Sequence, residues 1–384
     1  MASACPLHRG QGDDELESLR WHRFRRYWRS TRLSEGLQLS DRRHYRFRGQ
    51  LLTTAGNRCA AVVDTLVAVR VIVIGSGISG LGTAAELLRR RHEVTIISDE
   101  SITATTSFLS AAVWFPTAAG PTERVHAWGA ETFEYLEALA AQETPGVRMR
   151  ESLALYREDP VVPTWSSSVR AFRTADRGEL PLGYHFGFRF AVPFVEMPTY
   201  LPYLRDRVDA AGGHRLHRKV RRLDDLADLA PDVVVNCAGL RASELVGDRQ
   251  TYPIRGQIVR VTNPGLSVSI RDEAHPLGRA YVHPRENDCI LGGSLDRDRW
   301  DTTANPQLTQ SILDRCRDLA PRLAECRVIE TLVGLRPGRA EVRLELDTDC
   351  WPSVPVIHNY GHGGSGVTIA YGCAREAAAF VDEL

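Results

Sequence analysis

A glycine-rich turn between a strand and a helix most constrains the fold of this 384-residue chain. Residues 69–74, Val-Arg-Val-Ile-Val-Ile, are a short β-branched run that predicts a buried parallel strand. Gly75, Gly77 and Gly80 follow it, and the Leu- and Ala-rich segment 81–91 predicts a helix. A second strand is expected at 93–98, next to Asp99. Together these features predict a βαβ unit that binds a dinucleotide.

The three glycines have separate roles in such a unit. Gly75 allows the tight turn, Gly77 lets a pyrophosphate approach the backbone, and Gly80 lets the helix and strand pack closely. The free N–H groups at the helix N-terminus then face the phosphate, and Asp99 can accept a hydrogen bond from a ribose hydroxyl. This pattern does not choose between NAD and FAD.

A second glycine-rich loop lies near the C-terminus, at residues 361–366, and leads into a helix that we expect from Val367 to the end of the chain. Four glycines in six residues favour close contact with a flat ring. His358 and His362 have the i, i+4 spacing of helical metal ligands, but a loop so rich in glycine is not a helix, so we expect no metal. Other helices are expected near 122–142, 199–211 and 306–319, with a strand at 232–236 and strand-rich segments at 254–262 and 281–293.

Composition excludes several classes of protein. The 48 basic and 48 acidic side chains cancel, which argues against a dedicated nucleic-acid binder. The eight cysteines are scattered without a CxxC pair, so reduced thiols are expected. We find no apolar run long enough to span a membrane and no signal-peptide pattern, and we expect a cytoplasmic protein. The strong preference for arginine over lysine indicates a GC-rich bacterial genome.

Residues 1–66 differ from the rest of the sequence. They are rich in arginine and show no sustained apolar periodicity, so we expect a basic, disordered extension that adds nothing to the core. Our hypothesis is that the natural chain starts at Val67, whose codon can serve as a bacterial start. The competing hypothesis is that the arginine–aromatic run 21–29 binds RNA or an anionic membrane.

From about Val69 to Leu384 the chain resembles the D-amino-acid oxidase family of FAD enzymes. The most specific segment is 358–368, His-Asn-Tyr-Gly-His-Gly-Gly-Ser-Gly-Val-Thr. Supporting segments occur in the family's order at 105–107, 111–114, 235–239, 255–257, 281–284, 291–293 and 334–337. The resemblance implies an α/β fold with a Rossmann-like FAD-binding domain (67–115, 199–243 and 336–384) and a substrate-binding domain with a mixed sheet (116–198 and 244–335).

The resemblance also implies that FAD is bound non-covalently, and it indicates which residues bind it. Backbone donors at Gly366, Val367 and Thr368 are suited to negative charge that develops on the reduced ring. The full set of expected cofactor residues is Gly75, Gly77, Ile78, Ser79, Gly80, Asp99, Thr105, Thr106, Ser107, Ala111, Ala112, Val220, Ala238, Gly239, Arg336, Gly363, Gly364, Gly366, Val367 and Thr368.

In the family, the arginine that Arg336 matches binds the substrate α-carboxylate, and a guanidinium suits this because its planar fork donates two parallel hydrogen bonds. Tyr281 matches a tyrosine whose hydroxyl reaches the same carboxylate, and the Gly364 carbonyl matches the acceptor of the substrate amine. The resemblance implies oxidative deamination of D-amino acids, with hydride transfer from Cα, no side chain acting as acid or base, and hydrogen peroxide released from O2.

Some positions depart from the family pattern. Leu277 stands where a lid tyrosine is common, and Ser365 where an aromatic residue is common. Leu295 stands where D-aspartate oxidases carry an arginine, which favours neutral substrates, although Arg279 and Arg297 keep D-aspartate oxidation open. A glycine or sarcosine-type amine oxidase and a catalytically silent dinucleotide sensor are two more hypotheses for this chain. We expect no membrane partner and leave a homodimer open.

Overall fold

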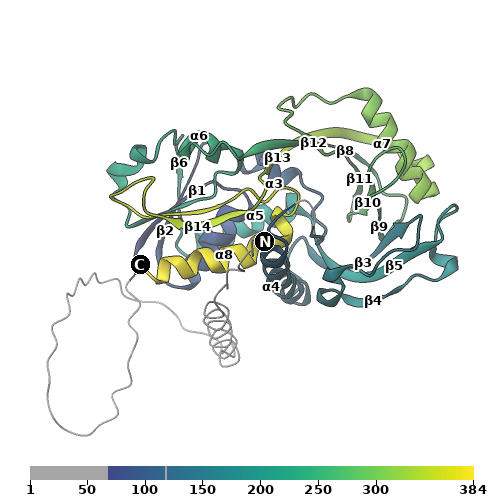
Figure 1. The fold of residues 1–384 in the computed structure, drawn as a ribbon, viewed down its shortest axis with the longest axis horizontal. Coiled ribbons are helices and arrows are strands. Elements are labelled where there is room, and N and C mark those ends of the chain that lie inside the picture. The colour runs from purple at the N-terminus through teal and green to yellow at the C-terminus, as the bar shows by residue number, and fades with distance from the viewer. Residues whose placement is uncertain (1–67, 117–118) are drawn as a thin grey trace, which may run out of the picture. The chain divides into compact units, whose positions relative to one another are not determined.

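The computed structural model describes residues 68–116 and 119–384 (Figure 1). The hypotheses about residues 1–66 lie outside the described residues. The described chain forms two β-sheets with helices packed on them, which confirms the predicted α/β fold with a second, mixed sheet.

The first sheet has six strands in the order β14-β15-β7-β1-β2-β6. The strand β1 pairs in parallel with β2 and β7, and only the edge strand β14 runs antiparallel to its neighbour. The bounds are β1 (Arg70–Ile74), β2 (Glu93–Ser98), β6 (His214–His217), β7 (Val233–Asn236), β14 (Arg343–Asp347) and β15 (Val356–Tyr360).

Both faces of β1 are buried, which explains its uninterrupted β-branched sequence. Val71 and Val73 pack with the helices α2 (Ile78–Arg89), α5 (Met197–Ala210) and α8 (Gly366–Asp382). Ile72 and Ile74 point to the opposite face and pack with Leu226 of the 3-10 helix η4 (Leu223–Leu229). The predicted strand–glycine–helix–strand unit is therefore confirmed as β1, α2 and β2, although α2 begins at Ile78 instead of Leu81.

The second sheet has nine strands in the order β12-β8-β11-β10-β9-β3-β5-β4, with β13 also paired to β8. Its pairs are antiparallel except for β3 and β9, which makes the sheet mixed. The bounds are β3 (Val147–Tyr156), β4 (Arg170–Thr174), β5 (Phe186–Val195), β8 (Tyr252–Thr262), β9 (Ser269–Asp272), β10 (Ala280–Pro284), β11 (Asp288–Gly292), β12 (Asp296–Arg297) and β13 (Val328–Gly338).

The helix α7 (Pro306–Leu319) packs on this sheet through Ile312 and Cys316, which share a core with Val282 and Leu291. Asn305 caps its N-terminus by accepting from the Leu308 N–H at 3.0 Å. The predicted helices near 122–142, 199–211 and 306–319 are confirmed as α4 (Thr122–Ala141), α5 and α7. The shorter elements are η1 (Ile102–Ala104), α3 (Thr106–Leu109), η2 (Thr164–Ser168), η3 (Arg177–Glu179), η5 (Gly239–Arg241), α6 (Ala242–Val246) and η6 (Pro321–Glu325).

The strands of the six-stranded sheet all come from the segments that we assign to FAD binding, and the domain boundaries remain a proposal. The helix α4, which we place in the substrate-binding domain, packs along α8. There the Thr132 hydroxyl accepts hydrogen bonds from the Tyr371 and Gly372 N–H groups at 3.2 and 3.0 Å.

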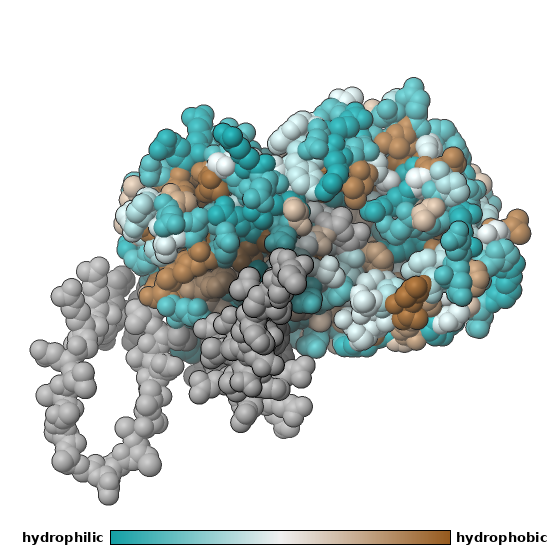
Figure 2. Space-filling model, viewed as in Figure 1, coloured by the Kyte–Doolittle hydropathy of each residue, from teal (hydrophilic) through white to brown (hydrophobic). Residues whose placement is uncertain are grey.

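The surface drawn in Figure 2 is mainly hydrophilic, with hydrophobic side chains in a few separate groups. Within the described part of the chain, no helix combines the length and the apolar character that crossing a membrane requires.

Candidate active site

A cavity of about 640 Å³ lies where the turns after β1, β2 and β7 approach β8, β9, β10 and β13. All the predicted cofactor and substrate residues line it except Gly80. These residues come from distant parts of the sequence, so the fold brings the predicted site together. The lining set is Gly75, Gly77, Ile78, Ser79, Asp99, Thr105, Thr106, Ser107, Ala111, Ala112, Val220, Ala238, Gly239, Tyr281, Arg336, Gly363, Gly364, Gly366, Val367 and Thr368.

The turn between β1 and α2 has no room for a side chain at Gly75. Gly75 has a φ of +109°, and a Cβ on it would lie 2.5 Å from the Cys237 carbonyl oxygen. Gly80 lies behind the cavity, where a Cβ would overlap the Gly75 carbonyl oxygen. The Ile78 N–H, at the start of α2, donates to the Ser107 hydroxyl at 3.0 Å. Gly77, Ile78 and Ser79 all line the cavity, so the N-terminus of α2 borders it at a position where an anion is favoured.

Charged groups lie beyond the end of β2. Asp99 lines the cavity as predicted, and its carboxylate is ion-paired with Arg241. Arg241 also donates to Glu100 at 2.6 Å. Arg218 and Arg241 both line the cavity, and neither was identified from the sequence. Such residues are hard to single out in an arginine-rich sequence, because most of the arginines that the structure describes form ion pairs with carboxylates.

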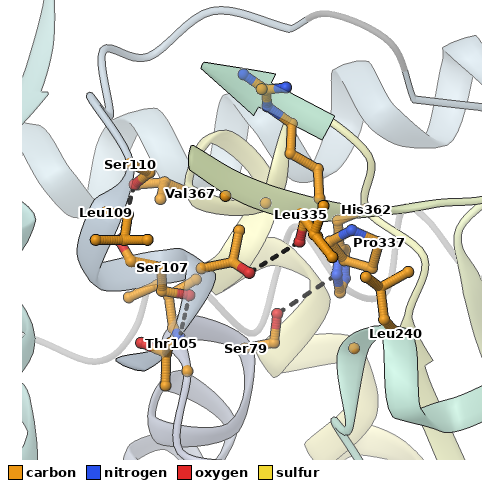
Figure 3. A pocket seen from close by; sticks show the side chains of 18 of the residues that line it. Ser79, Thr105, Ser107, Leu109, Ser110, Leu240, Leu335, Pro337, His362 and Val367 are labelled. Atoms are coloured by element: carbon orange, nitrogen blue, oxygen red, sulfur yellow. Dashed lines mark hydrogen bonds between the residues drawn. The ribbon is translucent and has the colours of Figure 1, made fainter. Parts of the chain in front are cut away.

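The 105–107 segment connects the cofactor region to β13. Thr105 caps α3 by accepting from the Phe108 N–H at 3.3 Å, and Thr106 donates to the Leu335 carbonyl oxygen at 2.8 Å. Figure 3 shows Thr105, Ser107 and Leu335 around the same pocket. These bonds fix the wall of the cavity next to Arg336.

The loop 361–366 bends back onto β13, where the Gly363 N–H donates to the Pro337 carbonyl oxygen at 2.8 Å. Gly363 has a φ of +52°, a conformation that favours glycine. The helix α8 begins at Gly366, and the first residues of this helix, Gly366, Val367 and Thr368, line the cavity. The Thr368 hydroxyl accepts a hydrogen bond from the Phe115 N–H at 3.2 Å and donates one to the Phe115 carbonyl oxygen at 3.1 Å. These bonds use the Thr368 side chain and not the backbone N–H groups of the first turn of α8.

A hydrogen-bonded chain links this loop to α2. Asn359 donates to the Thr83 hydroxyl at 3.1 Å, so its Oδ1 accepts from His362 Nε2 at 3.0 Å. The other ring nitrogen, Nδ1, is then an acceptor for the Ser79 hydroxyl at 3.4 Å, and Figure 3 shows Ser79 and His362 facing each other. Burial lowers the pKa of His362 to about 4, so its ring is neutral at pH 7.

This shift predicts a pH-dependent stability. Because the native state disfavours the protonated ring, the stability from His362 is present above pH 6.5 and is lost as the pH falls toward 4, by about 3 kcal/mol. We expect His362→Gln, measured without FAD by urea unfolding, to show a smaller loss between pH 6.5 and 4.5 than the unmodified protein. Equal losses would contradict the assignment of a neutral, buried ring.

His358 and His362 do not form a metal pair, because His358 faces away toward Asp347 at 3.2 Å. Among the described residues, Asp347, Cys350 and His358 bring potential ligand atoms within 4.8 Å of one another. Arg343 donates to the same Asp347 oxygen at 3.0 Å, and Asn236 Nδ2 lies 3.4 Å from His358 Nδ1. We therefore interpret this cluster as an ion-pair network between β14, β15 and β7 and propose no metal for it.

Two glycines leave the space that the Arg336 and Tyr281 side chains occupy at the cavity. A Cβ on Gly256 of β8 would overlap the Arg336 guanidinium, and a Cβ on Gly292 of β11 would overlap the Tyr281 ring. Arg336 also donates to the Ser294 carbonyl oxygen at 3.2 Å. Burial raises the pKa of the Tyr281 hydroxyl, which keeps it protonated and able to donate. The sequence segments 255–257 and 291–293 are thereby explained as space for these two side chains.

The strands β9 and β10 present a polar face to the cavity. Arg271 is directly opposite Tyr281, and two flanking pairs connect the same strands. His283 Nδ1 lies 2.7 Å from the Ser269 hydroxyl, and Arg279 is ion-paired with Glu273 at 2.7 Å. Sequence reasoning missed Arg271 and His283, because a polar residue at every second position is equally typical of a solvent-facing strand.

Arg271 is 5% exposed, and its Nε has no hydrogen-bond partner among the described residues. Its guanidinium carbon lies 3.8 Å from the centroid of the Phe115 ring, and burial lowers its pKa to about 10. A buried, charged group without a carboxylate partner is costly. Arg271 is therefore suited to an anionic or hydrogen-bonding ligand in the cavity.

The structure also shows where the residues that bear on substrate preference lie relative to the cavity. Leu295 and Arg279 line the cavity, whereas Arg297 does not and contacts the Tyr252 hydroxyl and ring instead. Leu277 is 59% exposed and lies outside the lining, and Ser365 is buried below the loop. Arg297 is therefore poorly placed to bind a substrate.

The cavity fits FAD on its own geometry. It offers the N-terminus of α2 for the pyrophosphate, Asp99 for a ribose, and the N-terminus of α8 for the flavin, in one continuous space. Gly77 lines the cavity at the turn before α2 and has no side chain to block the close backbone approach that a dinucleotide needs. Together the parallel sheet, the fingerprint turn and the mixed sheet define a two-sheet, FAD-dependent oxidoreductase.

Comparison with known proteins agrees with this class. The family model described as FAD dependent oxidoreductase (DAO) matches residues 70–380. A D-amino-acid oxidase of Rubrobacter xylanophilus is 48% identical over 314 residues, covering 82% of this chain and 96% of that protein. A human D-aspartate oxidase is 37% identical and covers 82% of this chain and 95% of that protein. The chain therefore belongs to the D-amino-acid oxidase family of FAD-dependent oxidoreductases.

Solved structures support the fold alone. A glycine oxidase from Bacillus cereus has a TM-score of 0.66 at 18% identity, and one from Geobacillus kaustophilus has 0.68 at 15%. Each comparison covers 82% of this chain and 95% of the other.

Proposed function

We propose that the protein catalyses the FAD-dependent oxidative deamination of D-amino acids. The observation that carries this proposal is the placement of Arg336 and Tyr281 together at the cavity, each in space left by a glycine. A guanidinium and a protonated phenol beside it can bind one carboxylate with several hydrogen bonds. The site residues and their roles are part of the proposal.

The substrate's handedness follows from two fixed contacts. Arg336 and Tyr281 hold the α-carboxylate, and the carbonyl of Gly364, which lines the cavity, accepts from the amine. With these two groups held, only the D-enantiomer directs its Cα–H to the flavin and its side chain to the remaining space. Bound FAD would accept the hydride and return the electrons to O2, giving hydrogen peroxide. The imino acid then hydrolyses in water to a 2-oxo acid and ammonia.

One experiment tests the proposal directly. The purified, yellow protein is mixed with D-alanine or L-alanine under nitrogen, and the flavin absorbance is followed. We expect bleaching by D-alanine and none by L-alanine, with peroxide produced when air is admitted. A protein that binds FAD but is bleached by neither enantiomer, nor by other D-amino acids, would be a silent dinucleotide binder.

We propose that neutral D-amino acids are preferred, since Leu295 lines the cavity where D-aspartate oxidases carry an arginine. A D-aspartate oxidase activity is the second candidate, and Arg271 is the observation that favours it. Arg271 is buried at the cavity with its Nε unpaired among the described residues, whereas Arg279 is already paired with Glu273. Arg271, rather than Arg279 or Arg297, would then bind the side-chain carboxylate.

Substitution of Arg271 separates the two candidates. If acidic substrates are used, Arg271→Leu should lower kcat/KM for D-aspartate by at least about 30-fold, because a buried charged pair contributes about 2–5 kcal/mol. Turnover of D-alanine should change less than about threefold, since D-alanine has no group to reach Arg271. The control is Arg297→Leu. Arg297 lies outside the cavity, so this substitution should change kcat/KM for neither D-aspartate nor D-alanine. A preference for D-alanine over D-aspartate in the unmodified protein would exclude the second candidate.

A further inference from the structure

We propose that His283 is a specificity-determining residue that hydrogen-bonds an oxygen of the substrate's side chain. The substrate class would be D-amino acids with a carboxamide or hydroxyl side chain, such as D-asparagine and D-threonine. This inference rests on the proposed oxidation of D-amino acids and names the part of the cavity that selects among them.

The position of His283 relative to the carboxylate site supports this role. His283 follows Tyr281 by two residues on β10, so both side chains lie on the same face of the strand. Their rings stack with centroids 4.6 Å apart and an interplanar angle of 14°. Both residues line the cavity. A substrate whose carboxylate is held by Tyr281 therefore has His283 within reach of a short side chain.

The imidazole is held in place and uncharged. His283 is 5% exposed, and Ser269 engages Nδ1 at 2.7 Å, which leaves Nε2 for a ligand. Burial, together with the charge of Arg271, keeps the pKa of His283 well below its usual value. A neutral ring offers Nε2 as donor or acceptor according to its tautomer.

The chemistry of the neighbours narrows the ligand further. A carboxamide or hydroxyl can both donate and accept, so it matches either tautomer of His283. Arg271 beside it can only donate, and it suits the oxygen of the same side chain. A hydrocarbon side chain would give no partner to His283 Nε2 or to the Arg271 guanidinium, and sites built for hydrogen bonding reject such analogues strongly.

Matched pairs of substrates test this role. D-asparagine and D-leucine have nearly the same shape, as do D-threonine and D-valine, but only the first of each pair has polar side-chain groups. We expect the unmodified protein to prefer D-asparagine to D-leucine in kcat/KM. His283→Leu should reduce this ratio at least tenfold and retain FAD. His283→Gln, which keeps a polar group near the position of Nε2, should retain part of the preference.

Binding without turnover gives a second measurement. Succinamate and 4-methylpentanoate are the analogues of D-asparagine and D-leucine that lack the amine, and calorimetry on the holoenzyme gives their Kd ratio. The ratio should favour succinamate and fall at least tenfold in His283→Leu, while His126→Leu on α4 should leave it unchanged. If His283→Leu does not fold, His283→Gln provides the test through a smaller fall in the same ratio.

The outcomes separate this inference from the proposed function. A protein that oxidises no D-amino acid overturns the proposed function itself. If D-alanine is oxidised but His283→Leu lowers kcat/KM by the same factor for every substrate, His283 has only a structural role and the inference is wrong. Unchanged ratios in a folded, FAD-bearing His283→Leu protein would also overturn it.

Discussion

Replacing Arg336 with alanine should lower kcat/KM for D-alanine by about 10²- to 10³-fold while FAD stays bound. The guanidinium is held at the cavity above Gly256, and a carboxylate there would lose its planar, two-pronged donor. Losing such a buried, charged hydrogen-bonded pair costs about 2–5 kcal/mol. Steady-state kinetics and the absorbance of bound flavin provide the measurement.

Two further variants make this result specific to the guanidinium. Arg336→Lys should also be poor, because an ammonium retains the charge but not the bidentate geometry. Arg297→Ala is the matched control, since that arginine lies on β12 outside the cavity lining. If Arg336→Ala oxidised D-alanine with unchanged kcat/KM, the carboxylate would have to bind elsewhere, and Arg271 would be the first residue to test.

Local patterns predicted the parts of the fold that depend on neighbouring residues. The strand–glycine–helix–strand unit at 69–99 combines a buried strand, a tight turn and a helix within a short segment, so β1, α2 and β2 could be placed directly. The helix α7 was predicted at its observed bounds from the helical pattern of residues 306–319. The resemblance added the distant contacts, which bring Arg336, Tyr281 and the 361–366 loop to one cavity.

The remaining parts depend on pairing between distant segments. The strands β3, β4 and β5 were not predicted, because their residues are selected by neighbours across the nine-stranded sheet rather than by a local turn. Arg271 and His283 were missed for a related reason. Their alternating pattern shows that one face of β9 and β10 is polar, but only the tertiary structure shows that this face borders a cavity instead of solvent.

Gly256→Ala should be nearly as damaging as the loss of Arg336, although Gly256 carries no functional group. Gly256 lies in β8, and its φ is not in the left-handed region, so alanine is tolerated by the backbone. The added Cβ would overlap Nη1, Cζ and Nη2 of Arg336, and the flexible guanidinium must move away. We therefore expect kcat/KM to fall by about 10²-fold, with FAD content and Tm close to those of the unmodified protein. Gly178→Ala, which has no heavy atom within 4 Å of its Cβ, is the matched control and should have no effect.

A double-mutant cycle shows whether Gly256 acts through Arg336. If the glycine only makes room for the guanidinium, Gly256→Ala should add almost nothing once Arg336 is already alanine, because there is no longer a side chain to displace. The double variant should then equal Arg336→Ala within about threefold in kcat/KM. If the two losses in kcat/KM multiply, the new methyl group disturbs the cavity independently of Arg336. It could do so through the neighbours of Gly256 in β8, because Arg255 and Gln257 form hydrogen bonds to residues 301–305. The sign and size of this coupling therefore test the geometry of the carboxylate site itself.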